Sequence, residues 1–356
     1  MNEMMAVTID NRAVGIGHPC FIIAEVGVNH NGNPDIAKSM VDAIADAGAD
    51  CVKFQTFSAE EFVNSPNEMY EYHSQGKKVK ESMLEMFRRL ELRRDEFAGL
   101  FEYARKRGLI PLSTPTDRHA ADLLDDLGAG AFKVGSDDLV YTPFLDYIAK
   151  KNKPIIISTG MANATDIDRA VNTISGTGNG QIIILHCVSL YPTPENEVNL
   201  RKISTLRSMY DFPIGFSDHS AGITAALGAV TLGACVLEKH FTLDRNMPGP
   251  DHWFSADPDE LTSLVREVRQ LESNLGHGRM WPSKAEQEMT AVCRRSVVTA
   301  KDLSKGQIIT EADLAYKRPG TGLLPYEVDK ILGKRTRCFL PTGIQIEYYH
   351  LEDRDK

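Results

Sequence analysis

Short apolar runs recur between residues 21 and 241, and each ends in polar side chains that are able to do chemistry. Helix-length segments separate the runs, an alternation typical of parallel strands joined by crossover helices. Eight such units predict a closed (β/α)8 TIM barrel, in which reactive side chains gather at the carboxyl ends of the strands. The runs are Phe21–Ala24, Cys51–Phe54, Leu109–Leu112, Ala131–Val134, Ile155–Ile157, Ile182–Leu185, Ile214–Phe216 and Val236–Leu237.

The connection 57–94, between the second and third runs, is longer than the others. Its segment 67–80 is polar and aromatic, so we expect a lid or a surface excursion over the barrel mouth. Elsewhere, apolar residues at helical spacing predict helices between the strands. These helices are expected at 34–47, 95–106, 164–174, 221–232 and 258–275.

The pattern changes after residue 275, where Gly276-His277-Gly278 and Trp281-Pro282-Ser283 are typical of a linker. We predict a barrel domain over 1–275, a linker over 276–293 and a small, mostly β domain over 294–356. A domain of about 60 residues can just sustain a core. Its predicted short segments are 296–300, 307–309, 336–339 and 344–346.

The composition of the chain limits the classes of molecule that it is expected to bind. The chain is 42% hydrophobic and 25% charged, with a formal net charge of −9, which argues against nucleic acid or an acidic membrane as partner. A few lysines in a pocket could still bind a small anion. No apolar run approaches the roughly 18 residues of a membrane span, and the first residues lack a signal-peptide core. The six cysteines are scattered, with no CxxC pair, so we expect reduced thiols in a cytoplasmic protein.

Two histidines, His219 and His240, stand at the ends of the last two predicted strands. Adjacent barrel strands would bring both imidazoles to one rim, within reach of a single divalent ion. Two neutral imidazoles with open positions suit a loosely held Mn²⁺, Mg²⁺ or Zn²⁺. The alternative is a pair of hydrogen-bonded core histidines.

Two lysines, Lys53 and Lys133, lie inside apolar strands, where an ammonium group is costly unless it meets an anion. The partner is either a carboxylate, such as Glu25 or Glu238, or a bound phosphate or carboxylate. Hydroxyl groups near the other strand ends favour a bound anion, since they would complete an oxyanion cradle. These are Ser113, Thr114, Ser136, Ser158, Thr159, Ser189 and Ser217.

Glu25 ends the first predicted strand. A carboxylate at the barrel mouth can hold sugar hydroxyls, orient a water or act as a general base. It can also simply position a loop through a salt bridge.

Ten motifs, in order through almost the whole chain, closely resemble the sialic acid synthase family. They are AEVGVNHNG (24–32), VKFQTF (52–57), STP (113–115), FKVGS (132–136), ISTGM (157–161), HCVSLYPTP (186–194), GFSDHS (215–220), EKHFT (238–242), PGPDH (248–252) and KRPGTG (317–322). The resemblance implies a TIM barrel followed by an antifreeze-like (SAF) domain, in a domain-swapped homodimer.

The resemblance also implies a reaction: phosphoenolpyruvate condenses with an open-chain N-acetylated amino sugar, N-acetylmannosamine, and water, giving N-acetylneuraminic acid and phosphate. By position, His219 and His240 would bind Mn²⁺ or Mg²⁺. The implied phosphoenolpyruvate ligands are Lys53, Thr114, Lys133, Ser136, Ser158, Ser189 and Ser217. The implied sugar ligands are Glu25, Gln55, Tyr191, Asp251 and, from the partner subunit, Arg318. Ser189 replaces an asparagine of some family members, and its hydroxyl has a shorter reach.

Other functions stay open. Bacterial relatives make legionaminic or pseudaminic acid from diacetamido sugars; the first-strand motif speaks against the pseudaminic branch. The sequence does not separate N-acetylmannosamine from 2,4-diacetamido-2,4,6-trideoxymannose, which would give N,N′-diacetyllegionaminic acid. A class I aldolase with a Schiff base on Lys133 or Lys53 also fits a barrel, as does a non-enzymatic protein that binds ice or a glycan through its tail. The paired histidines and the hydroxyl ring disfavour the aldolase. The non-enzymatic alternative is disfavoured because every motif position but Ser189 retains a competent side chain.

Overall fold

The computed structural model describes residues 6–352. It contains two compact units, one ending at Gly276 and the other beginning at His277, and each is described by itself. No helix in the described range is long and apolar enough to cross a lipid bilayer. All six cysteines are free thiols.

The first unit is built on eight parallel strands in the order β7-β4-β3-β12-β11-β10-β9-β8. The strands at the two ends of this order, β7 and β8, also lie in contact, so the sheet curls into a nearly closed barrel. The predicted TIM-barrel fold is therefore confirmed. The strands are β3 (Phe21–Gly27), β4 (Cys51–Thr56), β7 (Ile110–Pro115), β8 (Phe132–Val134), β9 (Ile155–Ser158), β10 (Ile182–Cys187), β11 (Ile214–Asp218) and β12 (Val236–His240).

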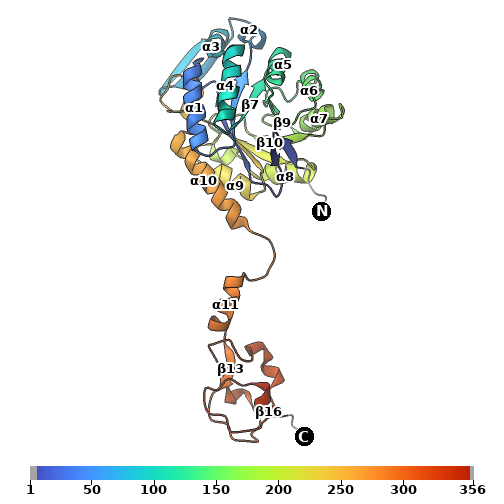
Figure 1. Ribbon diagram of the computed structural model, residues 1–356, viewed down its shortest axis with the longest axis vertical. Coiled ribbons are helices and arrows are strands. Elements are labelled where there is room, and N and C mark those ends of the chain that lie inside the picture. The colour runs from blue at the N-terminus through green and yellow to red at the C-terminus, as the bar shows by residue number, and fades with distance from the viewer. Residues whose placement is uncertain (1–5, 353–356) are drawn as a thin grey trace. The chain divides into compact units, whose positions relative to one another are not determined.

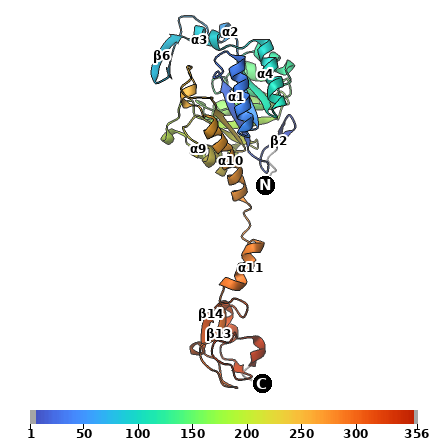
Figure 2. The same cartoon turned by 60° about the vertical axis from the view of Figure 1, so that its left-hand side comes forward.

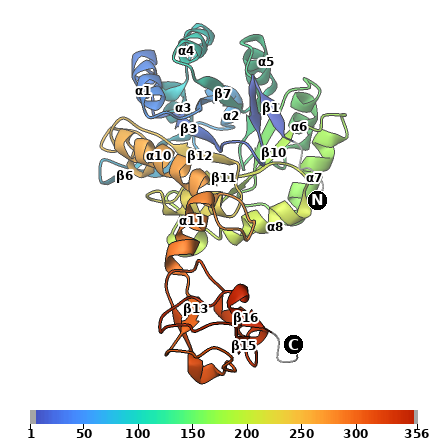
Figure 3. The same cartoon turned by 60° about the horizontal axis from the view of Figure 1, so that its bottom comes forward.

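Helices between the strands cover the outside of the barrel (Figures 1 and 3). The first of them, α1, begins where the side chain of Asn33 accepts hydrogen bonds from two backbone N–H groups, and it buries Ala37, Met40 and Ile44 against the sheet. The helices are α1 (Pro34–Asp46), α4 (Arg94–Lys106), α5 (Arg118–Asp126), α6 (Thr142–Ala149), α7 (Ala164–Ser175), α8 (Arg201–Met209), α9 (Thr224–Thr231) and α10 (Pro258–Leu275).

Side chains along each strand alternate between two apolar clusters. In β3, Ile22 and Ala24 pack between the sheet and the helices, whereas Phe21 and Ile23 fill the barrel interior. Because the alternation has a period of two, the residue two positions after an interior residue also points inward. Glu25 therefore faces the interior of the barrel.

An N-terminal hairpin that the sequence analysis missed closes one end of the barrel. Its strands, β1 (Val7–Ile9) and β2 (Arg12–Val14), are antiparallel, and Val7, Ile9 and Val14 belong to the interior cluster. Figure 2 shows β2 at one end of the first unit, with α2, α3 and β6 at the other.

The long connection 57–94 forms the expected excursion. It contains α2 (Ala59–Phe62), an antiparallel hairpin of β5 (Met69–Ser74) and β6 (Lys77–Ser82), and α3 (Met83–Leu90). A cluster of Val28, Phe57, Met86 and Leu90 packs α3 onto the barrel rim.

Three predicted segments of the second unit differ from the structure, and in the segment 336–339 only Thr336 lies in a strand. Residues 307–309 and 344–346 make isolated bridges, Ile308 to Arg335 and Gln345 to Val298, in place of paired strands, because the chain turns away after one residue. A strand at 314–317 was not predicted, and a helix lies within the predicted linker. The elements are α11 (Lys284–Cys293), β13 (Ser296–Thr299) paired with β14 (Leu314–Lys317), and β15 (Arg335–Thr336) paired with β16 (Leu351–Glu352).

Candidate active site

A cavity of about 580 Å³ opens at the carboxyl ends of the barrel strands, and we call it the charged cavity. Most of the predicted site residues line it together. They are Glu25, Lys53, Gln55, Thr114, Lys133, Ser136, Ser158, Ser189, Tyr191, Ser217, His219 and His240.

The alternation of side chains along each strand explains how these residues come together. Lys53 follows the interior residue Cys51 by two positions, and Lys133 follows Ala131 in the same way. Both lysines are buried, with no more than 3% of their surface exposed. The carboxyl ends of the strands thus form a polar layer directly above the apolar filling of the barrel.

Both lysines have carboxylate partners. The Lys53 ammonium lies 2.7 Å from Glu25 Oε2 and 3.6 Å from Glu238 Oε2. The Lys133 ammonium lies 3.7 Å from Glu238 Oε1. Glu238 therefore lies between the two ammonium groups, and the ion-pair partners that the sequence offered are both present.

The same lysines also donate to hydroxyl groups. Lys53 Nζ donates to Thr114 Oγ1 at 3.1 Å, and Lys133 Nζ donates to Ser158 Oγ at 2.8 Å. Ser217 donates to Glu238 Oε1 at 2.8 Å. The cavity thus contains hydroxyl groups of the predicted cradle, among them Thr114, Ser158 and Ser217, alongside the carboxylates, and each lysine has both kinds of partner.

Burial sets the protonation of this cluster. It raises the pKa of Glu25 to about 7, although the neighbouring Lys53 opposes the shift. Burial also opposes ionisation of Glu238, yet the charges of Lys133 and Lys53 hold its pKa at about 2. Burial lowers the pKa of Lys133. Near neutrality, Glu25 is therefore the carboxyl group of this cluster that can most readily gain or lose a proton.

Two serines meet at Gly160. Its backbone N–H donates to Ser136 Oγ at 2.9 Å, and a Cβ atom there would collide with the hydroxyls of Ser136 and Ser189. The Ser189 hydroxyl thus lies at Gly160 together with the Ser136 hydroxyl, although the Ser189 side chain is short. Two other predicted hydroxyls are turned away because they bond to neighbouring strands: Ser113 to Thr56 at 2.7 Å, and Thr159 to the Leu185 carbonyl at 3.0 Å.

The two histidines lie side by side at the cavity rim, with ring centroids 5.4 Å apart. His219 Nδ1 is 2.8 Å from the Val188 carbonyl oxygen, so its Nε2 is left for another partner. His240 Nδ1 is buried without a hydrogen bond. These imidazoles fit a divalent ion that keeps most of its positions open, and no group of three or more His, Cys, Asp or Glu in residues 6–352 would hold one more fully.

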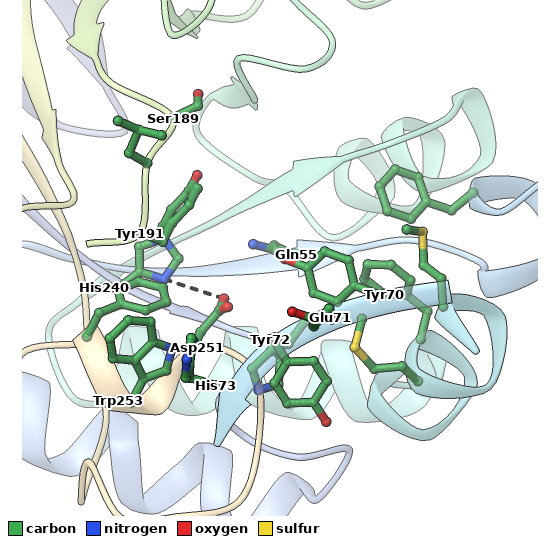
Figure 4. A pocket seen from close by; sticks show the side chains of 18 residues that line it. Gln55, Tyr70, Glu71, Tyr72, His73, Ser189, Tyr191, His240, Asp251 and Trp253 are labelled. Carbon is green, nitrogen blue, oxygen red and sulfur yellow. Dashed lines mark ion pairs between the residues drawn. The ribbon is translucent and has the colours of Figure 1, made fainter. Parts of the chain in front are cut away.

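The predicted sugar ligands are only partly together. Tyr191 packs on His219, with ring centroids 4.2 Å apart. Asp251 Oδ2 lies 3.7 Å from His240 Nδ1 (Figure 4), and burial raises the Asp251 pKa to about 6. Asp251 lines an adjoining cavity with Gln55, Tyr191 and His240. Arg318 is exposed and belongs to the second unit.

Asp138 and Cys187 are among the residues of the charged cavity that sequence reasoning missed. Asp138 Oδ2 is buried without a hydrogen bond, and burial raises the Asp138 pKa to about 7. The signal was present, because two acidic residues follow Ser136 directly. Cys187 follows the interior residue Leu185 by two positions, so the alternation of side chains along the strand predicts that it faces inward.

Comparison with known proteins agrees with this site. The NeuB family model matches residues 40–280, and the SAF domain model matches residues 294–352. The chain is 43% identical over 315 residues to N,N′-diacetyllegionaminic acid synthase of Campylobacter jejuni, covering 88% of this chain and 94% of that protein. It is 38% identical over 329 residues to human N-acetylneuraminate-9-phosphate synthase, covering 91% and 90%.

A solved structure gives the same result. The N-acetylneuraminic acid synthetase of Leptospira borgpetersenii, in complex with citrate, superposes with a TM-score of 0.73 at 37% identity, covering 80% of this chain and 95% of that chain. The chain therefore belongs to the NeuB family of nonulosonic acid synthases, as an enzyme with a C-terminal SAF domain.

Proposed function

We propose that this enzyme condenses phosphoenolpyruvate with the open-chain form of an N-acetylated amino sugar and water, giving a nonulosonic acid and phosphate. N-acetylmannosamine is the acceptor that the sequence resemblance implies, with N-acetylneuraminic acid as product. The observation that carries this proposal is the pairing of Lys53 and Lys133 with hydroxyl groups directly below the rim that holds His219 and His240.

The lysine cradle fits the anionic substrate. Phosphoenolpyruvate carries a carboxylate and a phosphate, and charge-assisted hydrogen bonds from ammonium and hydroxyl groups are the strong way to hold both. Lys53, Lys133 and Ser158 supply such donors from three different strands. Ser136 and Ser189 extend the ring at Gly160.

The imidazoles of His219 and His240 would hold Mn²⁺ or Mg²⁺ at the rim. When bound, such an ion polarises an aldehyde oxygen as a Lewis acid. The buried Nδ1 of His240, which has no hydrogen-bond partner, supports this assignment. So does the backbone bond of His219, because a fixed imidazole presents its other nitrogen in a constant direction.

In the proposed reaction the methylene carbon of phosphoenolpyruvate bonds to the aldehyde carbon, and the aldehyde oxygen takes up a proton to become a hydroxyl group. Water gives up a proton as it adds to the phosphate-bearing carbon, and the bond between that carbon and the phosphate oxygen then breaks, so that phosphate leaves and a ketone remains. Glu25, held by Lys53 and by Gln55 at 3.2 Å, is placed to orient this water or to accept its proton. A pKa of about 7 suits that exchange. Holding two small substrates in line can be worth roughly 7–11 kcal/mol.

A second acceptor, 2,4-diacetamido-2,4,6-trideoxymannose, is favoured by the 43% and 41% identity to proteins named N,N′-diacetyllegionaminic acid synthase. The test of the reaction is direct: phosphate release from phosphoenolpyruvate should require a sugar acceptor, and the product should have the mass of a nine-carbon keto acid that keeps the N-acetyl groups of the acceptor. A class I aldolase would instead be trapped on a lysine by borohydride with pyruvate.

We further propose a domain-swapped homodimer in which Arg318 reaches the partner's barrel and donates to the N-acetyl carbonyl of the sugar. A connection as long as 276–293 can carry a small domain across a two-fold axis. Mixing Arg318→Ala chains with Lys133→Met chains should restore activity, since each heterodimer then has one complete site. No recovery in verified heterodimers would mean that Arg318 does not act across subunits.

A further inference from the structure

A second cavity, of about 540 Å³, adjoins the charged cavity, and we call it the aromatic cavity. Gln55, Tyr191 and His240 line both, so the two open into each other beside the histidine rim. Figure 4 shows His240, Asp251 and Trp253 on one side of the aromatic cavity and Tyr70 on the other.

Its walls come from elements far apart in the chain. One wall is the excursion, where Phe62 and Phe87 meet edge-on with ring centroids 4.9 Å apart, and Met83 of α3 lies beside them in the lining. The other is a short 3₁₀ turn after β12, where Trp253 and Phe254 meet at 5.8 Å. Most of the lining is therefore apolar and aromatic.

The charged side chains that line this cavity favour some ligands over others. Among the described residues that line it there is no lysine or arginine, whereas Glu71 and Asp251 contribute carboxyl groups. Glu71 is paired with Lys78, at 2.7 Å, on the neighbouring strand of the hairpin. His73 and His240 also line it, so a phosphate group in this cavity would face carboxyl groups, aromatic rings and imidazoles, but no lysine or arginine.

We propose that the aromatic cavity receives the tail of the acceptor sugar, and that it selects a tail carrying methyl and acylamino groups over one carrying free hydroxyls or a phosphate. This inference rests on the proposed function, since it takes the aldehyde end of the acceptor to lie at His219 and His240. The shared residues Gln55 and Tyr191 then mark where the chain of the sugar passes from one cavity into the other.

The expected preference among acceptor sugars follows from the apolar wall of the aromatic cavity. A methyl-sized group in an apolar pocket changes kcat/KM by roughly 10- to 200-fold, and such a pocket rejects an added hydroxyl only weakly. We expect 2,4-diacetamido-2,4,6-trideoxymannose to exceed N-acetylmannosamine about tenfold or more in kcat/KM. N-acetylmannosamine 6-phosphate should fall at least about 100-fold below N-acetylmannosamine, because its dianion meets the carboxyl groups of the lining and no lysine or arginine.

The experiment compares kcat/KM for these three acceptors on the unmodified full-length enzyme, measured as phosphate released. Equal or better use of N-acetylmannosamine or its 6-phosphate would overturn this inference while leaving the proposed function intact. If none of the three supports phosphate release, the proposed function fails and the inference fails with it.

A designed cation sharpens the test. Met83 is partly exposed at the start of α3, so Met83→Lys can place an ammonium at the wall without burying it fully. This variant should raise kcat/KM for the 6-phosphate at least about tenfold. Met83→Gln, of similar length without the charge, is the matched control and should show no such gain. A folded Met83→Lys enzyme with no gain would contradict the assigned place of the sugar tail.

Discussion

The two ends of the barrel interior are built from the same strands and have opposite chemistry. The apolar residue Ile23 is followed two positions later by Glu25, and Ala131 is followed in the same way by Lys133. The lower end is filled with apolar side chains and closed by the β1–β2 hairpin, whereas the upper end carries charges that are almost completely buried. Two residues along a strand therefore separate the apolar core of the barrel from the charged cavity.

The difference shows how the fold tolerates the site. Burying charges costs free energy unless they are paired, and here the Lys53, Glu25 and Glu238 charges partly satisfy one another. The apolar lower end supplies stability without taking part in chemistry. The two layers can therefore be changed separately, and the predictions below depend on that separation.

The largest effect should come from the lower layer. Ile156 is fully buried in the interior cluster, one strand period below Ser158. Ile156→Ala should lower the free energy of unfolding by about 2–5 kcal/mol, since it leaves a cavity. Turnover per folded molecule should stay within about twofold of the wild type, because the lining of the charged cavity is unchanged.

The matched variant is Ser158→Ala, which removes the hydroxyl that accepts from Lys133. It should cost about 0.5–1.5 kcal/mol of stability and lower the affinity for phosphoenolpyruvate. Urea unfolding and steady-state kinetics on both proteins measure the contrast. Equal losses of activity in the two variants would break the separation of the layers.

The second prediction concerns the charge of the upper layer. Lys133→Met keeps most of the side-chain stem and removes the ammonium group. Losing one charge-assisted hydrogen bond should weaken apparent phosphoenolpyruvate affinity about 10- to 150-fold. If Lys133 serves only to neutralise Glu238, 3.7 Å away, stability will fall while the KM for phosphoenolpyruvate stays unchanged.

The sequence predicted every barrel strand because each is an apolar run of the right length with a polar end. It did not say which polar residues share a face, since strands covered on both sides read as continuous apolar runs. Asp218 and Lys239 also stand at the ends of apolar runs, but they lie one position out of phase with Ser217 and Glu238. They pair with each other at 2.9 Å and do not line the charged cavity.

Tertiary features with weak local signals were out of reach. The strands of the β1–β2 hairpin are only three residues long, so their apolar pattern is too short to stand out. The aromatic cavity combines residues near positions 70, 87 and 253, and no periodicity connects them. The relation of Arg318 to any barrel likewise stays a prediction.

The third prediction tests the rim. His219→Ala or His240→Ala should lower the affinity for Mn²⁺ roughly 10-fold or more, because so few protein ligands are available. His186→Ala is the control: that histidine also lies on a barrel strand, but its ring bonds to the Val198 carbonyl at 2.7 Å and stacks on Phe216. Titration calorimetry with Mn²⁺ measures binding independently of turnover. Full activity after exhaustive chelation would refute a metal site.

The smallest effect should be a pH dependence carried by Glu25. Burial raises its pKa to about 7 in the folded chain, against 4.5 for an ordinary glutamate. An acid with a raised folded pKa contributes stability that is fully present below its unfolded pKa and is lost as the pH rises through the folded value. Between about pH 4.5 and 7, the wild type should therefore lose stability relative to Glu25→Gln, which cannot ionise. Urea midpoints of both proteins across this range measure the difference, in which the other titrating groups largely cancel. A difference that stays constant, or grows in favour of the wild type, would mean that Lys53 keeps Glu25 ionised throughout, so that this carboxylate serves as a fixed ion-pair partner and leaves proton transfer to another group.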